Sequence, residues 1–512
     1  MQSIGMRRWW ALAALDLGVL AVGLDVSVLS VALPTLASAL KASESDLQWF
    51  SSAYALVLAA GMLPAGVLGD RFGRKRVLLG ALVLFGLGSV ACALAVDPGE
   101  FIAGRVLLGA AGAAIVVMAL SVMTVLFSEA ERPRAVGIWA AANFLALPIG
   151  PIFGGWLLTN YWWGWIFLMN LPVAIVGMLA VLTIVPESRA SEKPSLDLVG
   201  IVVVTAGLVG VTYGLIELGR NGWTDGPSLT VLAVGLVLSI GFFLWERRLT
   251  ARPGGRPLID LALFQSRGFT WGTILAALGG LALIGLVFTL PQYFQGVLGL
   301  DPEGSGVRLL PLIGGMVAGA VPADSVAQRA GAKATVAFGF AITTVALLIA
   351  ATTAVDSSAA FIAGWMALLG FGMGVAFATA ASSALKTIPS EKSGVASALI
   401  QAVQKVGAPL GSAIFGSVLV TVYQSSLTLA GLPPVAAELV KRSVFAGVAV
   451  AAQVHSTALL TSVRSSFVQG MDTALVLSAA IAALAAVAAL LFLPGRETMA
   501  AEAEHPAAEK VA

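Results

Sequence analysis

Two charged side chains embedded in apolar sequence are the first candidates for chemistry. Asp25 lies about 15 residues into an apolar segment that begins at Trp10, and Arg105 lies in the first third of another. Charged groups inside a bilayer are costly and are functional by default. Burial disfavours the ionised form of a carboxyl group, so Asp25 is suited to exchanging a proton for a cationic substrate. The alternatives are a structural acid that joins two helices and an arginine that reaches backbone carbonyls or the membrane surface.

Three further charged residues stand in apolar segments. Asp16 precedes Asp25 by nine residues, which places it on the opposite face of a helix. It either guides protons or cations from the cytoplasm or forms a structural bond between helices, and the sequence leaves both open. Glu217 is a candidate for cation binding, although its place near the end of an apolar segment also fits an interfacial acid. Lys405 either lines a cavity or offsets one of the acids.

Aromatic and amide side chains in the same segments are candidates for a substrate pocket. Aromatic faces attract lipophilic cations through cation–π interactions. Most aromatic residues of membrane proteins instead pack or anchor the chain at an interface, so each assignment has a structural alternative. Together with Lys405, the candidates are Tyr54, Trp139, Asn143, Phe144, Gln292, Tyr293 and Gln295.

The composition indicates that membrane helices must position these residues. Of the 512 residues, 58% are hydrophobic and 11% are charged. Soluble domains carry about 25% charged residues, so this chain has too few to cover a water-facing surface. A net charge of +2 is too small to indicate nucleic-acid binding. The single cysteine, Cys92, cannot form an internal disulfide, and the two histidines stand far apart, so no metal site is expected.

Fourteen spanning helices are predicted where charged and Pro/Gly-rich breaks divide the chain. Lys and Arg concentrate in alternate loops, which places those loops and both termini in the cytoplasm. The apolar run after Arg8 continues to Pro34 without a cleavage site and is interpreted as a retained first helix. The chain is therefore predicted to be an all-α, multi-pass protein of the cytoplasmic (inner) membrane. The predicted ranges are 10–33, 48–69, 77–96, 101–127, 135–158, 164–185, 197–217, 229–245, 268–296, 306–327, 334–354, 359–385, 394–422 and 472–493.

A charged, glycine-containing loop follows the second predicted helix and recurs in worn form after the tenth. The first copy contains Gly66, Asp70, Arg71, Gly73 and Arg74. The second copy, at 319–333, carries Gln328 in place of the aspartate, so a lock built on it should be weaker. A carboxylate at a helix end can pair with arginine to close the cytoplasmic side. The alternative is that the loop only orients the chain, although orientation does not need the glycines.

The repeated loop predicts two similar six-helix bundles, at 1–190 and 267–497. Two inserted helices and a cytoplasmic connector occupy 191–266. The second bundle includes an amphipathic hairpin at the outer surface, at about 423–471, whose role the sequence leaves open. The tail at 498–512 is predicted to be disordered and cytoplasmic.

These motifs, in this order, resemble the fourteen-helix drug/proton antiporter branch of the major facilitator superfamily. The resemblance runs from about Trp10 to Leu493 and includes the first-helix segment 24–34, the loop 66–76 and the arginine motif 105–112. It also includes the segments 165–172 and 291–311. The antiporter motif of the fifth helix is matched by Gly150, Pro151, Gly154 and Gly155. Small residues and a proline there suit a hinge and a seal, with ordinary tight packing as the alternative.

The resemblance implies proton-coupled export of hydrophobic, often cationic drugs by alternating access between two halves. It implies the major facilitator fold, small-molecule substrates and protons as partners in a lipid bilayer, a monomeric state and no cofactor beyond the proton gradient. An exporter dedicated to one natural product or antibiotic is an alternative, and a proton-driven uptake symporter is a weaker one. An enzyme is not expected, because no nucleophile–base set and no Gly-x4-Gly-Lys-Ser/Thr loop is present.

Overall fold

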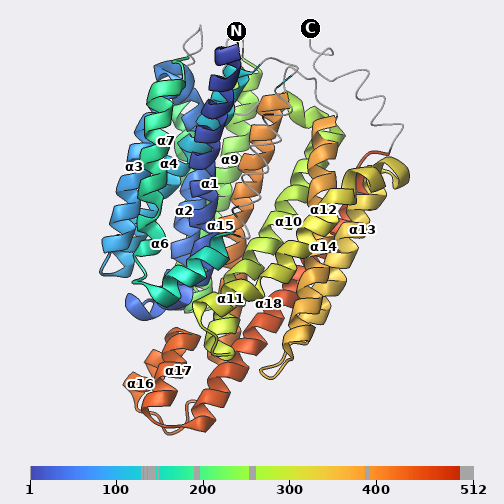
Figure 1. Cartoon of the computed structure of the whole chain (residues 1–512). Helices are drawn as coiled ribbons and strands as arrows, with labels where there is room; N and C mark the ends of the chain where they lie inside the picture. Colours follow the sequence, from blue (N-terminus) through green and yellow to red (C-terminus); the bar gives the residue numbers. More distant parts are fainter. Residues whose placement is uncertain are drawn as a thin grey trace. The chain divides into compact units, whose positions relative to one another are not determined.

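The computed structural model describes residues 2–127, 131, 135, 146, 149–188, 197–252, 261–386 and 393–495. Within these ranges every regular element is a helix and no strand occurs, as Figure 1 shows. The all-α prediction is therefore confirmed for the described part of the chain.

Eleven of the described helices are long and apolar enough to cross a membrane. A twelfth span results if the bent pair Glu44–Met62 and Pro64–Phe72 is counted as one. The bend of 50° between them falls at Pro64, which lacks a backbone donor and clashes with the preceding turn. Of the remaining two predicted spans, half of 135–158 lies outside the described residues, and 394–422 coincides with the helix α15 (Ser393–Ser426). The count of fourteen stays a prediction.

The first compact unit comprises Met1–Ala206 and Leu300–Val307. Within it, α2 and α3 pack against α4, and α7 packs against α1 and α3. Helix starts are well defined: Ser43 and Asp46 form a capping box at α2, and Asp97 caps α4. The helices are α1 Gln2–Ala39, α2 Glu44–Phe72, α3 Arg74–Leu94, α4 Pro98–Leu126, α6 Trp165–Leu168, α7 Asn170–Ile184 and most of α11 Pro302–Arg308.

The second unit comprises Gly207–Gly299 and Arg308–Ala512. Its closest helix pair is α12 and α14, where Gly315, Gly319, Gly370 and Gly374 each face the backbone of the opposite helix. Its elements are α8 Leu198–Asn221, which begins in the first unit, α9 Gly226–Thr250, η1 Leu261–Gln265, α10 Arg267–Gln292, the π-helix η2 Tyr293–Val297, α12 Leu310–Ala330, α13 Ala332–Ala350, α14 Ala359–Lys386, α15, α16 Pro434–Arg442, α17 Val444–Gln453 and α18 Thr457–Phe492. The predicted bundle bounds stay a prediction, and the predicted tail lies outside the described residues.

The outer segment predicted at about 423–471 contains the ends of two flanking helices as well as the hairpin. Helix α15 continues to Ser426, and only α16 and α17 form the hairpin. The last helix begins at Thr457 rather than at 472, because the Ser456 side chain accepts a hydrogen bond from the backbone N–H of Leu459 and caps it. Its 36 residues span about 54 Å, against about 30 Å for the hydrocarbon core, so its first turns extend beyond the membrane. The start of the last helix was predicted wrongly because an apolar run marks only the part of a helix that lies in the bilayer, and this helix begins before that part.

Candidate functional site

Asp25 and Arg105 form a buried ion pair between α1 and α4. Arg105 Nη1 lies 2.5 Å from Asp25 Oδ2, and the two side chains are 1% and 0% exposed, respectively. Arg105 Nε donates a second hydrogen bond to the carbonyl of Phe50, at 3.0 Å. The structure thus brings together the two charged residues that head the list of sequence candidates. Each charge has a partner, which a desolvated ion requires.

The second carboxylate oxygen of Asp25 faces an amide that sequence reasoning did not single out for chemistry. Asn170 Nδ2 lies 3.5 Å from Asp25 Oδ1 and 3.3 Å from Ser89 Oγ. Asn170 and Ser89 are 1% and 0% exposed. A detectable indication was an asparagine standing in an otherwise apolar run, where burying an amide requires hydrogen-bond partners.

Tyr54, which was predicted to line a substrate pocket, is packed within the same cluster. The Arg105 guanidinium carbon lies 4.3 Å from the centroid of the Tyr54 ring, and the Tyr54 hydroxyl donates to the Val22 carbonyl at 3.4 Å. The side chain is 1% exposed. One face of the ring is therefore occupied by Arg105, so Tyr54 stabilises the buried cation in this structure.

The remaining charged candidates lie elsewhere. Asp16 is buried, and its Oδ1 atom has no hydrogen-bond partner among the described residues. It lies about 13 Å from Asp25 along α1, on the opposite helix face. Glu217 forms a local cluster near the end of α8 with Arg220, at 3.7 Å, and with Asn221, at 3.1 Å. The structure therefore joins neither acid to the Asp25–Arg105 pair.

Three pocket candidates stand where α10 passes into the π-helix η2. Tyr293 is fully buried and donates to the Ala354 carbonyl at 2.9 Å. Gln292 is also fully buried; its amide nitrogen donates to Phe288, and its oxygen has no partner among the described residues. Gln295 is half-buried on the same turn. The side chain of Lys405, on α15, and the residues Trp139, Asn143 and Phe144 fall outside what the structure describes.

Asp472 is an acid that sequence reasoning missed. It lies on α18, is partly buried, and has an Oδ1 atom without a hydrogen-bond partner among the described residues. It acts electrostatically on Tyr293. In the sequence, Asp472 stands at the first residue of a predicted span, a position where acidic residues are common. Because α18 begins 15 residues earlier, Asp472 lies well inside the helix.

The charged loop joins the ends of several helices in the first unit. Arg74 Nη2 lies 2.9 Å from Asp70 Oδ1, and Arg74 Nη1 donates to the Ser121 carbonyl of α4 at 3.4 Å. The turn uses Gly73 at φ +107°, a conformation that favours glycine. Arg71 instead covers the neighbouring Phe72 ring, at 5.6 Å. Gly66 faces Val117 of α4, and an added Cβ would lie 3.6 Å from it, an ordinary contact.

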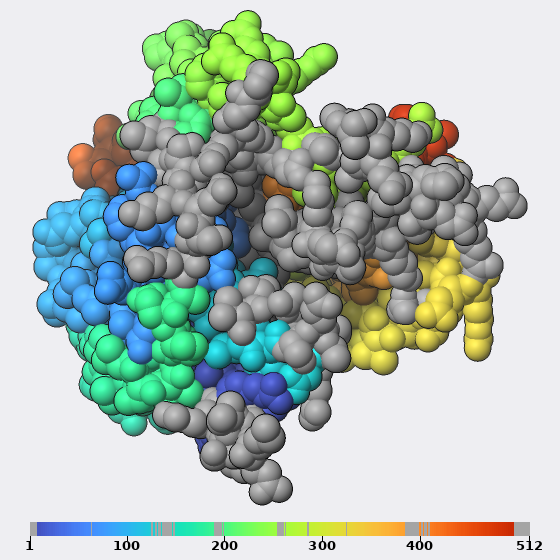
Figure 2. Space-filling view, turned by 90° about the horizontal axis from the view of Figure 1, so that it is seen from above, coloured from blue at the N-terminus to red at the C-terminus, as the bar shows by residue number. Residues whose placement is uncertain are grey.

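The same loop also contacts the segment that ends α7. Lys75 Nζ donates to the Leu182 carbonyl at 2.7 Å, and Arg76 lies 3.6 Å from Glu187. Figure 2 looks onto this end, where the blue loop lies beside the green end of α7. The loop therefore connects α2, α3, α4 and α7, which is more than an orientation role needs.

The antiporter-motif residues lie in the helical segment 149–160, and their backbone lies close to neighbouring helices on two sides. A Cβ added at Gly150 would collide with Ser27 Oγ, and one at Gly154 would lie 2.6 Å from the Val28 side chain of α1. On the other side, a Cβ at Gly155 would lie 2.6 Å from the Pro302 carbonyl of α11. The Pro151 carbonyl in turn faces Gly306 of α11 at a distance that leaves no room for a side chain. Small residues are thus sterically required at this motif.

Comparisons with known proteins agree with this architecture. Residues 15–412 match the family model described as Major Facilitator Superfamily. The chain is 33% identical over 496 residues to the tetracenomycin C resistance and export protein of Streptomyces glaucescens, covering 94% of this chain and 91% of that one. It is 31% identical to the multidrug efflux pump LfrA of Mycolicibacterium smegmatis, covering 95% and 96%, and 32% identical to the methyl viologen resistance protein SmvA of Salmonella typhimurium, covering 92% and 95%.

Solved structures show the same fold. An inward-facing bacterial homolog of the human lysosomal transporter Spinster superposes with a TM-score of 0.68 at 16% identity, covering 97% of this chain and 98% of that one. A D-xylose–proton symporter superposes with a TM-score of 0.59 at 17% identity, covering 95% and 98%. At these identities the likeness establishes the fold and nothing finer.

Proposed function

Because this chain belongs to the major facilitator superfamily, we propose that it is a proton-coupled antiporter that exports hydrophobic, often cationic drugs. In this proposal it is a monomeric transporter, not an enzyme, of the fourteen-helix branch, in the cytoplasmic membrane with both termini inside. The export of drugs or antibiotics by its relatives supports the direction of transport. The proton gradient is the energy source, and no cofactor is needed.

The observation that carries the proposal is the Asp25–Arg105 pair. A carboxylate 2.5 Å from a guanidinium, with both side chains buried, is a charge pair whose stability depends on the protonation of one member. A proton on Asp25 removes the negative charge and leaves the cation of Arg105 without its counterion. The guanidinium then keeps only its weaker partners, the Phe50 carbonyl and the Tyr54 ring. Protonation therefore weakens the link between α1 and α4.

Helix α1 offers a short route from this pair to the antiporter motif. Ser27, two residues after Asp25, donates to the Ala146 carbonyl at 2.8 Å and fills the space opposite Gly150. Val28 packs on Gly154 in the same way. A small rotation or shift of α1 on protonation would therefore move the helical segment 149–160, whose other side closes against α11. In this mechanism the protonation of Asp25 controls the opening of the substrate pathway at the end of the first unit where α11 lies.

The test is substrate-driven proton movement in proteoliposomes, with ethidium and tetraphenylphosphonium as cationic probes. Wild-type protein should exchange protons for both cations, and Asp25→Asn should abolish the exchange. Asp225→Asn is the matched control, because Asp225 is the N-cap of α9 and asparagine also caps helices. Full proton-coupled export by Asp25→Asn would refute the mechanism.

An exporter dedicated to one natural product is the second candidate. It is favoured by the 33% identity to a protein named for the export of tetracenomycin C. The same proteoliposomes distinguish the two by substrate range: a dedicated exporter would move neither synthetic cation yet exchange protons for one natural product, for which tetracenomycin C is the first probe. The uptake symporter is disfavoured by the match of residues 150–155 to the antiporter motif.

A further inference from the structure

The hydrogen-bond partner of the second Asp25 oxygen carries an inference that rests on the proposed antiport and deepens it. Asp25 Oδ2 is bound to Arg105, so an incoming proton has Oδ1 as its open position. Asn170 Nδ2 faces that oxygen at 3.5 Å. The orientation of the amide follows from chemistry, since an ionised carboxylate only accepts hydrogen bonds and the amide must present its nitrogen.

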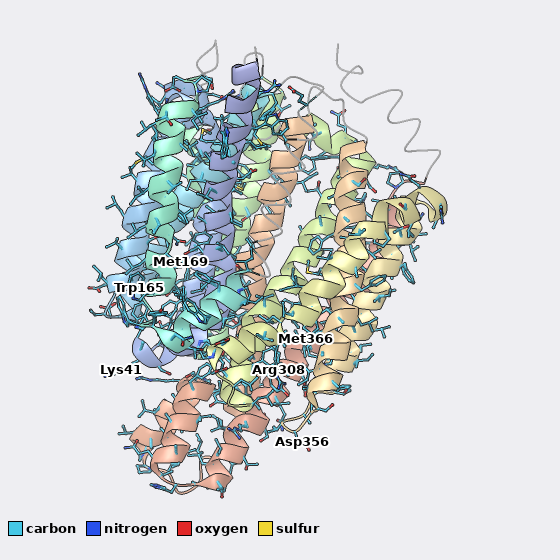
Figure 3. The ribbon with its side chains drawn as sticks, in the orientation of Figure 1. Lys41, Trp165, Met169, Arg308, Asp356 and Met366 are labelled. Atoms are coloured by element: carbon cyan, nitrogen blue, oxygen red, sulfur yellow. The ribbon has the colours of Figure 1, made fainter. Side chains whose placement is uncertain are left out.

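A single atom of Asn170 serves two partners. The nitrogen that faces Asp25 also lies 3.3 Å from Ser89 Oγ on α3. An amide nitrogen carries two hydrogens, so it can donate to the carboxylate and to the hydroxyl together. Trp165, the first residue of α6, and Met169, the residue just before this asparagine, are labelled in Figure 3. Asn170 follows at the start of α7, within a helix packed on both α1 and α3.

Protonation of Asp25 creates a mismatch of donors that a reversal of the amide resolves. Once Oδ1 of Asp25 carries a proton, that oxygen becomes a donor and faces the donor nitrogen of Asn170. A buried polar group without a partner is destabilising, and no side chain here is more than 2% exposed. Rotation of the amide by half a turn places its carbonyl oxygen where the nitrogen was. That oxygen can accept from protonated Asp25 and from the hydroxyl of Ser89, because serine donates as readily as it accepts.

We propose that Asn170 and Ser89 form a reversible hydrogen-bond switch that satisfies Asp25 in both of its protonation states. With ionised Asp25, Asn170 donates to the carboxylate and to Ser89. With protonated Asp25, the amide is reversed, and both Asp25 and Ser89 donate to it. Asn170 is thus a positioning residue that lets a fully buried carboxyl group gain and lose a proton.

The charged and titratable groups around Asp25 are few among the described residues. Helix α4 contributes Arg105, α2 contributes Tyr54, and α3 contributes Cys92, which Asp25 and Arg105 both influence electrostatically. Arg105 sets the charge of the site, and Tyr54 is hydrogen-bonded to Val22. Arg105 can only donate, and the hydroxyl hydrogen of Tyr54 is already donated to Val22, so neither offers Oδ1 both a donor and an acceptor. That capacity belongs to the amide.

The first test is the pH profile of ethidium–proton exchange in proteoliposomes. Asn170→Leu keeps the volume but removes the amide. Loss of the donor destabilises ionised Asp25 more than loss of the acceptor destabilises the protonated form, because hydrogen bonds to charged groups are the stronger ones. The midpoint should move to higher pH by about one unit, a tenfold rise in proton affinity. Ser89→Ala should shift it in a smaller step, and Ser478→Ala, an equally buried serine of α18, should not shift it.

The second test needs neither transport nor a variant that folds poorly. Infrared difference spectra of detergent-solubilised wild-type protein are recorded as pH is lowered, with asparagine isotopically labelled. The carboxyl band that is absent in Asp25→Asn should rise together with a change in an asparagine amide band. An Asp25 band without any amide change, or an unshifted midpoint in Asn170→Leu, overturns the switch. Absence of proton exchange by the wild type would instead refute the proposed antiport, and the spectra would still decide the switch.

Discussion

Replacing Arg105 with leucine removes the positive partner of Asp25 and keeps the buried position apolar. With charge centres about 4 Å apart and an effective dielectric constant of about 20, the attraction lost is about 4 kcal/mol. Removing one partner of a buried ion pair typically destabilises the folded protein by about 3–5 kcal/mol, a cost of the same size as this attraction. A carboxylate left alone in this buried site has no counterion, so Asp25 should favour its uncharged form in the variant. The variant should therefore bind substrate at neutral pH without exchanging it for protons.

The assay is proton release in proteoliposomes on addition of ethidium, measured over a range of pH. Arg105→Lys keeps the charge but not the guanidinium geometry that reaches both Asp25 and Phe50, so its midpoint should shift less. Arg220→Leu is the matched control. Its side chain is 63% exposed and lies 3.7 Å from Glu217, so its removal should cost less than about 1 kcal/mol of stability. The midpoint of proton release should not shift in this control. A folded Arg105→Leu protein with the wild-type midpoint would refute the ion pair as the coupling element.

Three further changes test other parts of the first and second units. Gly306→Val should destabilise the contact of α11 with the segment 149–160 by about 1–3 kcal/mol, which thermal unfolding of the purified protein would measure. Asp70→Asn should lower stability by less than about 1 kcal/mol, because its pair is partly exposed, yet reduce transport at least about tenfold; calorimetry with transport separates the two. The hydrogen bond from the Ser228 hydroxyl lowers the pKa of Asp225 below its usual 3.8, so the capped α9 loses stability as pH falls through that lowered value. Asp225→Asn should lose less stability on acidification, as thermal unfolding followed against pH would reveal, and an equal loss would contradict the assignment.

Much of the fold followed from the sequence because a membrane imposes simple rules. Apolar length and alternate basic loops predicted twelve helices that coincide with candidate spans, and a charged residue in an apolar segment identified Asp25 and Arg105. Each of these predictions depends on a single segment taken by itself. That the two residues meet was not specified by either segment, because nothing in a single segment says which helices become neighbours.

Contacts that need two or more helices were not predictable. Ser89 is an ordinary serine in an apolar helix until α7 brings Asn170 against it. Tyr54 was predicted to line a substrate pocket, and its partner in the structure is Arg105. The start of α18 was misplaced because a helix that leaves the bilayer continues with polar residues, which resemble a loop in the sequence.

The position of the Asp25–Arg105 pair follows from the spacing of residues along α4. Arg105 and Gly109 are four residues apart and share one helix face, and Phe50 and Tyr54 are four apart on α2. A Cβ added at Gly109 would lie 2.5 Å from the Tyr54 carbonyl, so the two backbones touch at this level. That contact sets the register in which the guanidinium, one turn earlier, meets the Phe50 carbonyl and the Tyr54 ring. With Nε and the ring face engaged by α2, Nη1 remains directed at α1, where Asp25 receives it. The glycine in the arginine motif therefore positions the charge, and the proposed proton chemistry depends on how closely α2 and α4 pack.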